Sequence, residues 1–256
     1  MKKTYLSGDF FAITDIGKVR AVNEDFADKR INSHGNILLV VADGMGGANK
    51  GDFASKSIGN YLCNQFVSDN KEFKKPAHAT KWLYKNINEI NKVIFKKAES
   101  NPEFKGMGTT LTVALLFGEF CVVGQVGDSR LYRLNAENNL QQMTHDQTLV
   151  QFLSSNKRIE EEDMKTHPER HKLTNALGIR NNANVDFTFF KYSGERLLLC
   201  SDGLYNNVPL GDIQSILRGN ESPERKCMQL IAFGNANGGS DNMAAVIWET
   251  NNGPQN

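Results

Sequence analysis

Acidic residues recur beside glycine or asparagine where apolar runs of this 256-residue chain begin or end. Asp43, for example, ends the run 37–42, and Asp202 ends the run 197–201. The same pattern gives six carboxylates in five clusters: Glu24, Asp25, Asp43, Asp128, Asp202 and Asp241. Glycine beside a carboxylate leaves room for the side chain, and for a backbone carbonyl, to approach a cation.

Carboxylates that converge on one point repel each other, and this repulsion is costly unless a cation neutralises them. Oxygen ligands of this kind suit hard divalent ions such as Mg²⁺ and Mn²⁺. A pair of such ions can activate a shared water for attack on a phosphate ester. The alternative is that each Asp-Gly pair only marks a turn, as these residues often do.

Arg20 lies four residues before Glu24 and is the candidate ligand for a substrate phosphate. A guanidinium fork matches two phosphate oxygens better than an ammonium does. If the segment between them is an extended strand, Arg20 and Glu24 point to the same side of it. The alternative is an ion pair between Arg20 and a neighbouring carboxylate such as Asp25.

The apolar pattern predicts the elements that must position these side chains. Strands are expected from short, continuous or β-rich apolar runs at 37–42, 111–117, 120–126, 196–200 and 243–248, with a hairpin at Gly118-Glu119. Helices are expected where apolar residues recur every three or four positions or where Pro opens a segment, at 54–66, 83–98, 209–218 and 223–235. Strands and helices in this order indicate a layered α+β domain.

The composition is that of an ordinary globular protein. Thirty Lys and Arg balance 29 Asp and Glu, so nothing in the net charge of +1 favours nucleic acid or an anionic membrane as a partner. No apolar run approaches the roughly 18 residues of a membrane span, and the N-terminus lacks the apolar core of a signal peptide. We therefore expect a cytoplasmic protein whose four separated cysteines are reduced.

We expect one domain over residues 1–250. The polar stretch at about 140–180 is either a flap over a site or a plain surface subdomain, and residues 251–256 are expected to form a disordered tail.

Six segments stand in an order that is specific to one family: TDIGKVRAVNEDF (14–26), VVADGMGGANKGDFAS (40–55), GTT (108–110), QVGDSRLY (125–132), LLLCSDGL (197–204) and GGSDNMAAVI (238–247). In these segments the chain resembles the metal-dependent PP2C-type (PPM) protein serine/threonine phosphatases of bacteria. The resemblance implies a four-layer αββα sandwich, in which two central antiparallel sheets are flanked by helices. It also implies hydrolysis of phosphoserine and phosphothreonine in proteins by a metal-activated water, without a phosphoenzyme intermediate.

The resemblance also implies roles for individual residues. Two tightly bound Mn²⁺ or Mg²⁺ ions are expected, with Asp43 bridging both and a third, weaker ion present in some members. The implied metal ligands are Glu24, Asp43, Gly44 (through its carbonyl), Asp128, Asp202 and Asp241. Asp25 is the implied outer-shell carboxylate, and Arg20 is the residue implied to bind the substrate phosphate. Arg20 and Asp43 are the implied catalytic residues.

Two positions depart from the family pattern. Met45 stands where some eukaryotic relatives carry a His proposed to donate a proton, and the family's Thr-x-Asp-His reads Thr144-His145-Asp146-Gln147. The remaining histidines, His171 among them, are expected to be solvated or capping. The resemblance implies a monomer acting on phosphoproteins, with a bacterial Ser/Thr kinase acting on the same substrates.

Two other functions stay open at this stage. The first is a pseudophosphatase, which would use the same fold as a binding or regulatory module. The second is a different two-metal phosphoesterase such as a nuclease, which would need a basic, aromatic-lined groove.

Overall fold

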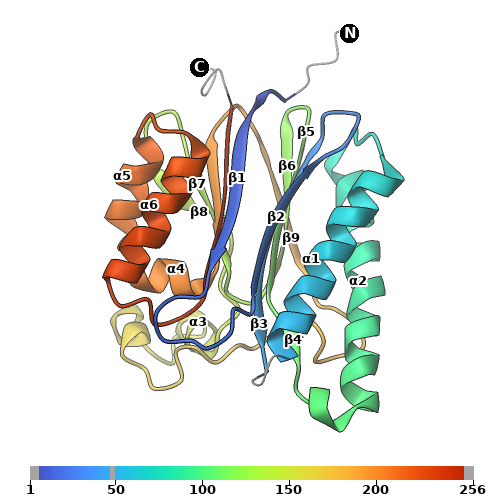
Figure 1. Cartoon of the computed structure of the whole chain (residues 1–256), viewed down its shortest axis with the longest axis vertical. Coiled ribbons are helices and arrows are strands. Elements are labelled where there is room, and N and C mark those ends of the chain that lie inside the picture. The colour runs from blue at the N-terminus through green and yellow to red at the C-terminus, as the bar shows by residue number, and fades with distance from the viewer. Residues whose placement is uncertain (1–5, 47–49, 251–256) are drawn as a thin grey trace.

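Two antiparallel β-sheets form the centre of the computed structural model, which describes residues 6–46 and 50–250 (Figure 1). One sheet has the order β1-β11-β10-β7-β8 and the other the order β2-β3-β5-β6-β9, with the short β4 paired to β3. The strands of the first are β1 (Gly8–Asp15), β7 (Arg130–Leu134), β8 (Leu140–Gln142), β10 (Arg196–Cys200) and β11 (Met243–Thr250). Those of the second are β2 (Asp25–Ile31), β3 (Ile37–Met45), β4 (Gly108–Thr109), β5 (Leu111–Phe117), β6 (Phe120–Val126) and β9 (Asp186–Lys191).

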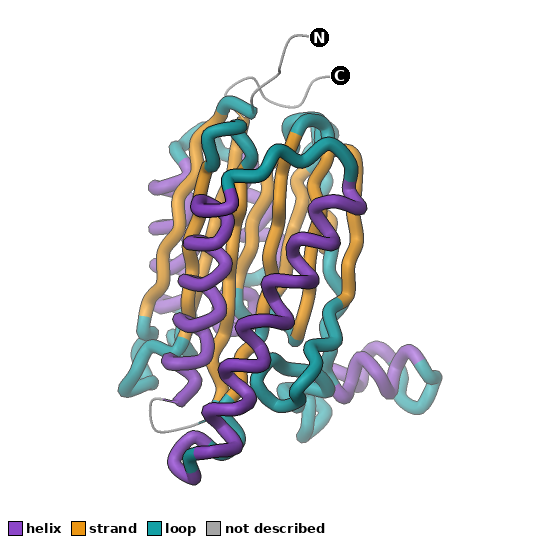
Figure 2. The backbone as a smooth tube through the Cα atoms, turned by 90° about the vertical axis from the view of Figure 1, so that its right-hand side faces the viewer, coloured by secondary structure: helices purple, strands orange, loops and turns teal. Residues whose placement is uncertain are grey.

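Helices cover the outer face of each sheet, as Figures 1 and 2 show. The second sheet is covered by α1 (Lys50–Asp69) and α2 (Pro76–Ser100), which a short turn, η1 (Pro102–Phe104), follows. The first is covered by α4 (Asp202–Asn207), α5 (Leu210–Arg218) and α6 (Pro223–Ala236). This four-layer arrangement confirms the expected α+β sandwich.

The alternation of side chains along β3 explains why its apolar run is continuous. Leu38 and Val40 pack with the helices α1 and α2, whereas Ile37, Leu39 and Val41 pack between the two sheets. Because neighbouring residues of a strand point to opposite faces, a strand between two apolar layers must be apolar at every position. All of these side chains are fully buried.

The polar stretch 140–180 contains β8, α3 (Leu149–Ser155) and a 3₁₀ turn, η2 (Glu161–Lys165). Thr148 forms an isolated β-bridge with Leu173, so the two ends of the segment that carries α3 and η2 lie side by side. We call residues 147–175 the flap segment. The tail predicted for residues 251–256 lies outside the described residues.

Candidate metal centre and active site

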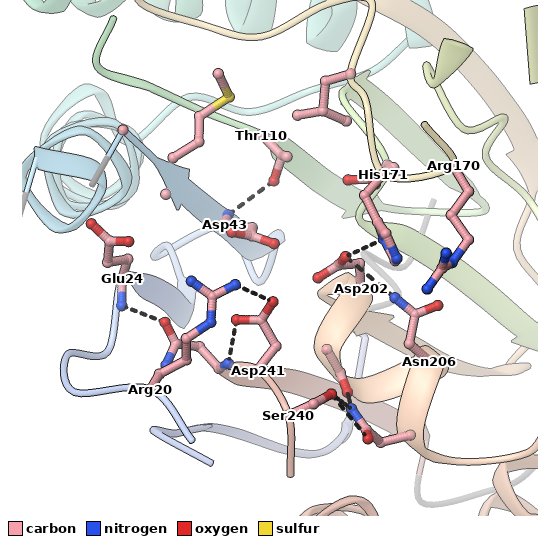
Figure 3. Close-up of a pocket in the computed structure, with 18 residues that line it drawn as sticks. Arg20, Glu24, Asp43, Thr110, Arg170, His171, Asp202, Asn206, Ser240 and Asp241 are labelled. Carbon is pink, nitrogen blue, oxygen red and sulfur yellow. Dashed lines mark hydrogen bonds and ion pairs between the residues drawn. The ribbon is translucent and has the colours of Figure 1, made fainter. Parts of the chain in front are cut away.

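A cavity of about 740 Å³ opens at the end of the sandwich where β3 ends and β11 begins. Its wall contains Glu24, Asp43, Asp128, Asp202 and Asp241, together with Arg20 and Gly44. Figure 3 shows the side chains of four of these acidic residues and of Arg20 converging from separate parts of the chain: Arg20, Glu24, Asp43, Asp202 and Asp241. The fold therefore brings the carboxylates that stand at the ends of apolar runs together in one cavity.

The sheet topology accounts for this convergence. Asp43 lies near the end of β3, Asp128 follows β6, Asp202 opens α4 just after β10, and Asp241 precedes β11. Consecutive antiparallel strands bring each of these points to the same end of the sandwich.

Thr110 and Thr109 fix the backbone of Asp43. The Asp43 N–H donates to Thr110 Oγ1 at 2.9 Å, and the Asp43 carbonyl accepts from the Thr110 N–H at 2.8 Å and from Thr109 Oγ1 at 2.9 Å. These bonds fix the backbone from which the Asp43 carboxylate extends into the cavity. The GTT segment thus supports the site through hydrogen bonds.

Gly44 lies against the first turn of α1. A Cβ at this position would lie 2.2 Å from the Gly51 carbonyl oxygen, so only glycine fits. This close approach places the backbone of Gly44 beside the cavity, as a carbonyl ligand requires.

Burial and mutual repulsion raise the pKa of three carboxyl groups at the site. Burial, mainly, raises the pKa of Asp25 to about 8, although the hydrogen bond from Ser201 Oγ at 2.6 Å opposes the rise. The pKa values of Asp43 and Asp128 lie well above their ordinary range because both lose hydration in the cavity wall and face other carboxylates, Asp202 among them. A cation between these groups would relieve the repulsion.

Arg20 forms an ion pair with Asp241, with 2.7 Å between Nη2 and Oδ2. The segment that carries Arg20 and Glu24 is a loop between β1 and β2, so the strand geometry considered for it is wrong. The loop turns at Gly17, whose backbone is in the left-handed region and packs against the Asp241 carbonyl. The Lys18 N–H then donates to the Gly239 carbonyl. The partner of Arg20 is thus Asp241 and not Asp25.

Glu24 is held by the N-terminus of α1, where the Gly51 N–H donates to Glu24 Oε1 at 3.0 Å. Within residues 6–46 and 50–250, no group of three or more His, Cys, Asp or Glu side chains is already arranged to hold a metal ion. Two of the predicted ligands, Glu24 and Asp241, are instead engaged by Gly51 and Arg20.

The sequence prediction missed cavity residues that the flap segment supplies. Arg170, His171 and Leu173 line the cavity, and His171 Nδ1 lies 3.8 Å from Asp202 Oδ2. His171 was expected to be solvated or capping. Its side chain is about half exposed but lies in the cavity wall, a place that the sequence did not indicate. The only signal in the sequence was the polar composition of the stretch 140–180, which could indicate a flap.

Asn206 was also missed, since nothing in the sequence marks it. It lies one helical turn after Asp202, and its Nδ2 donates to Asp202 Oδ2 at 3.3 Å. Met45 lines the cavity as well.

The model of the protein phosphatase 2C family matches residues 18–229, well over half of the chain. The chain belongs to the protein phosphatase 2C family. This phosphatase is 38% identical over 239 residues to the serine/threonine phosphatase stp of Listeria welshimeri, with 93% of this chain and 94% of that protein covered. It is accordingly a metal-dependent protein serine/threonine phosphatase, and phosphoproteins are its substrates.

Solved structures agree with this assignment. The serine/threonine phosphatase Stp1 of Staphylococcus aureus superimposes with a TM-score of 0.87 at 33% identity, over 96% of each chain. The catalytic domain of the phosphatase PstP, solved in complex with two manganese ions, superimposes with a TM-score of 0.82 at 32% identity, over 95% of this chain and 98% of that one. The similarity supports a divalent metal requirement for the present phosphatase.

The donor set in the cavity fits such ions. The predicted ligands are all oxygens, and lost hydration and neighbouring carboxylates raise the pKa of three carboxyl groups at the site. Hard divalent cations prefer oxygen ligands, and their charge offsets the cost of burying several carboxylates together.

No helix in the described part of the chain is both long enough and apolar enough to cross a membrane.

Proposed function

We propose that the phosphatase hydrolyses phosphoserine and phosphothreonine by direct attack of water at a centre for two Mn²⁺ or Mg²⁺ ions, without a phosphoenzyme intermediate. The observation that carries the proposal is the convergence of five acidic side chains and two arginines, Arg20 and Arg170, on a single cavity. The carboxylates match the charge of two cations, and the Arg20 guanidinium matches the charge of a phosphate.

The ligand roles are those that the resemblance implies, and the place of the ligands in one cavity wall supports them. Asp43 would serve both ions, Glu24 and the Gly44 carbonyl would hold one of them, and Asp202 and Asp241 would hold the other. Asp128, together with Asp202, would hold a third, weaker ion, and the buried Asp25 would act as an outer-shell carboxylate. When bound, divalent cations lower the pKa of a coordinated water and neutralise charge on the phosphoryl oxygens.

Arg20 binds and orients the phosphate. Its guanidinium is half exposed at the cavity wall, and its ion pair with Asp241 holds it there. Substrate phosphate then replaces the Asp241 carboxylate as its partner. Met45 has no proton to transfer, so the leaving alkoxide must take its proton from another source, such as solvent.

The four cysteines support attack by water over attack by a thiolate. All four are free and fully buried in the core, and burial raises the pKa of Cys63, Cys200 and Cys227 to about 12. Burial raises the pKa of Cys121 as well. A thiol with such a pKa is not a nucleophile at neutral pH.

The wider setting is a cytoplasmic monomer that reverses the action of a bacterial Ser/Thr kinase. The pseudophosphatase alternative uses the same fold, but the complete set of acidic residues in the cavity disfavours it.

Turnover of a phosphothreonine peptide with Mn²⁺, compared between the wild type and Asp43→Asn, tests the proposal. We expect the wild type to release phosphate and Asp43→Asn to lose most of this activity. The intact mass of the enzyme, quenched during turnover, should show no added phosphoryl group. An inactive wild type would favour the pseudophosphatase, and a phosphorylated enzyme would refute direct attack.

A further inference from the structure

Gln147 stands at the start of the flap segment, where the family pattern has His, and its hydrogen bonds reach three separate parts of the protein. The first part is the turn that carries Asp128. The Gln147 N–H donates to the Gly127 carbonyl at 2.9 Å, and the Gly127 N–H donates to Gln147 Oε1 at 2.8 Å. Gln147 therefore holds both backbone groups of the residue that directly precedes Asp128.

Gly127 has little freedom to move away from this contact. Its φ of +89° is in the left-handed region, and a Cβ there would lie 2.6 Å from Thr110 Cγ2. The turn is thus held between Thr110, which also binds the Asp43 backbone, and Gln147.

The second part is the far end of the flap segment. The Thr174 N–H and hydroxyl both donate to the Gln147 carbonyl, at 2.8 and 2.9 Å, and Asn175 Nδ2 donates to Gln147 Oε1 at 2.8 Å. Three residues before Thr174 lies His171, which lines the cavity with Arg170. The hydrogen bonds of Gln147 therefore fix Thr174 and Asn175, the residues that follow the cavity-lining Arg170 and His171.

The third part is β9, where Gln147 Nε2 donates to Asp186 Oδ2 at 2.6 Å. This bond orients the amide, because a carboxylate accepts only from the NH₂ group and leaves Oε1 for Gly127 and Asn175. A neutral imidazole has a single acceptor nitrogen, so a His at this position could not serve both donors.

We infer that Gln147 is a positioning residue that places the Asp128 turn and the cavity-lining part of the flap segment together. The functional half of this inference rests on the proposed function, because it treats the flap residues Arg170 and His171 as the wall that a substrate peptide meets. The structural half stands on the hydrogen bonds alone. Loosening Gln147 should therefore weaken peptide binding more than it slows the chemical step.

The decisive variant is Gln147→Glu, which keeps Oε1 but sets a carboxylate against Asp186. Losing the hydrogen bond and gaining the repulsion should raise KM for a phosphothreonine peptide roughly three- to tenfold, with kcat changed less than twofold. The kcat for p-nitrophenyl phosphate, which has no peptide to bind along the flap segment, should stay within twofold of the wild type. Amide hydrogen exchange at Leu149 and Thr174 should become faster.

A double variant that exchanges donor and acceptor in the Gln147–Asp186 hydrogen bond should restore the wild-type behaviour. In Gln147→Glu/Asp186→Asn, the new amide on β9 donates to the new carboxylate, so KM and exchange rates should return to within twofold of the wild type. Gln151→Glu is the matched control, since it makes the same change of charge in α3, where the side-chain amide donates to Ser155 Oγ of its own helix at 3.4 Å. It should leave all of these measurements unchanged.

Two results would overturn the inference: wild-type KM and exchange rates in Gln147→Glu, or a double variant no better than the single one. If Gln147→Glu does not fold, Gln147→Ala should give the same shift in KM and exchange, and a wild-type result there is equally contrary. Failure of the proposed function would appear differently, as an inactive wild type, while hydrogen exchange would still report on the positioning role.

Discussion

Replacement of Arg20 by Ala separates phosphate binding from metal binding. The guanidinium lies 2.7 Å from Asp241 in a half-exposed ion pair, and both residues line the cavity. A charge-assisted, two-pronged contact with phosphate contributes about 1.5–3 kcal/mol. At about 1.4 kcal/mol per tenfold change, Arg20→Ala should lower kcat/KM roughly ten- to 150-fold.

The same variant should not weaken metal binding. A solvent-exposed ion pair contributes about 0–1 kcal/mol, and removing it frees the Asp241 carboxylate. Affinity for Mn²⁺ should therefore stay the same or rise by no more than about fivefold. Arg20→Lys should recover only part of the lost rate, because an ammonium is a point charge and cannot reproduce the fork.

Three measurements on Arg20→Ala show whether Arg20 binds phosphate or organises the metal ligands: kcat/KM on a phosphothreonine peptide, Mn²⁺ affinity by calorimetry, and the melting temperature. Arg30→Ala is the matched control, because Arg30 also forms a partly exposed ion pair, with Asp28 on β2, but does not line the cavity. It should leave kcat/KM unchanged. Unchanged kcat/KM in Arg20→Ala would remove Arg20 from the phosphate site, and a loss of Mn²⁺ binding would mean that its role is to organise the ligands.

Three further predictions follow from the same site. Asp43→Asn should remove most of the activity and weaken metal binding, as calorimetry can show, because one residue serves both ions; full activity would refute the bridging role. Asp128→Ala should keep two tight ions while turnover slows, and loss of both ions from a folded variant, counted by native mass spectrometry, would contradict its assignment to the weaker site. In EDTA the melting temperature should fall as the pH rises from about 5 to about 8, since the native state keeps protons on Asp25 and Asp43 that the unfolded state has released. The gain in melting temperature on adding Mn²⁺ should grow over the same range, and a melting temperature in EDTA that rises with pH would show that the carboxyl pKa values are not raised.

The buried elements could be predicted closely from sequence. The hairpin of 111–117 and 120–126 forms with the expected limits, because both strands are buried and the two residues between them make a turn with Gly118 in the left-handed region. Strands β1, β2 and β9 were missed, because each lies at the edge of its sheet and mixes polar with apolar residues. The inner strand β7 was missed as well, since its five residues mix two arginines with apolar residues, and so were the short β4 and β8. Such segments become strands through their pairing partners, as β1 does along β11, and no local pattern records that pairing.

The site could be predicted only as a set of residues. Glycine beside carboxylates at the ends of apolar runs indicated which side chains meet, and the topology brings them to one cavity. The partner of Arg20 could not be predicted, because residues 221 positions apart meet only through the fold. His171 and Asn206 were missed for the same reason, since their place depends on how the flap segment and α4 pack.

The most direct test of the central claim is a metal titration of chelator-treated enzyme, with bound Mn²⁺ and phosphopeptide turnover measured in the same samples. A two-ion centre predicts no turnover without metal and activity that appears as the second equivalent binds. Mg²⁺ should restore activity in the same way. Full turnover in excess EDTA, with metal content confirmed as nil, or full turnover at one equivalent, would contradict the two-ion centre.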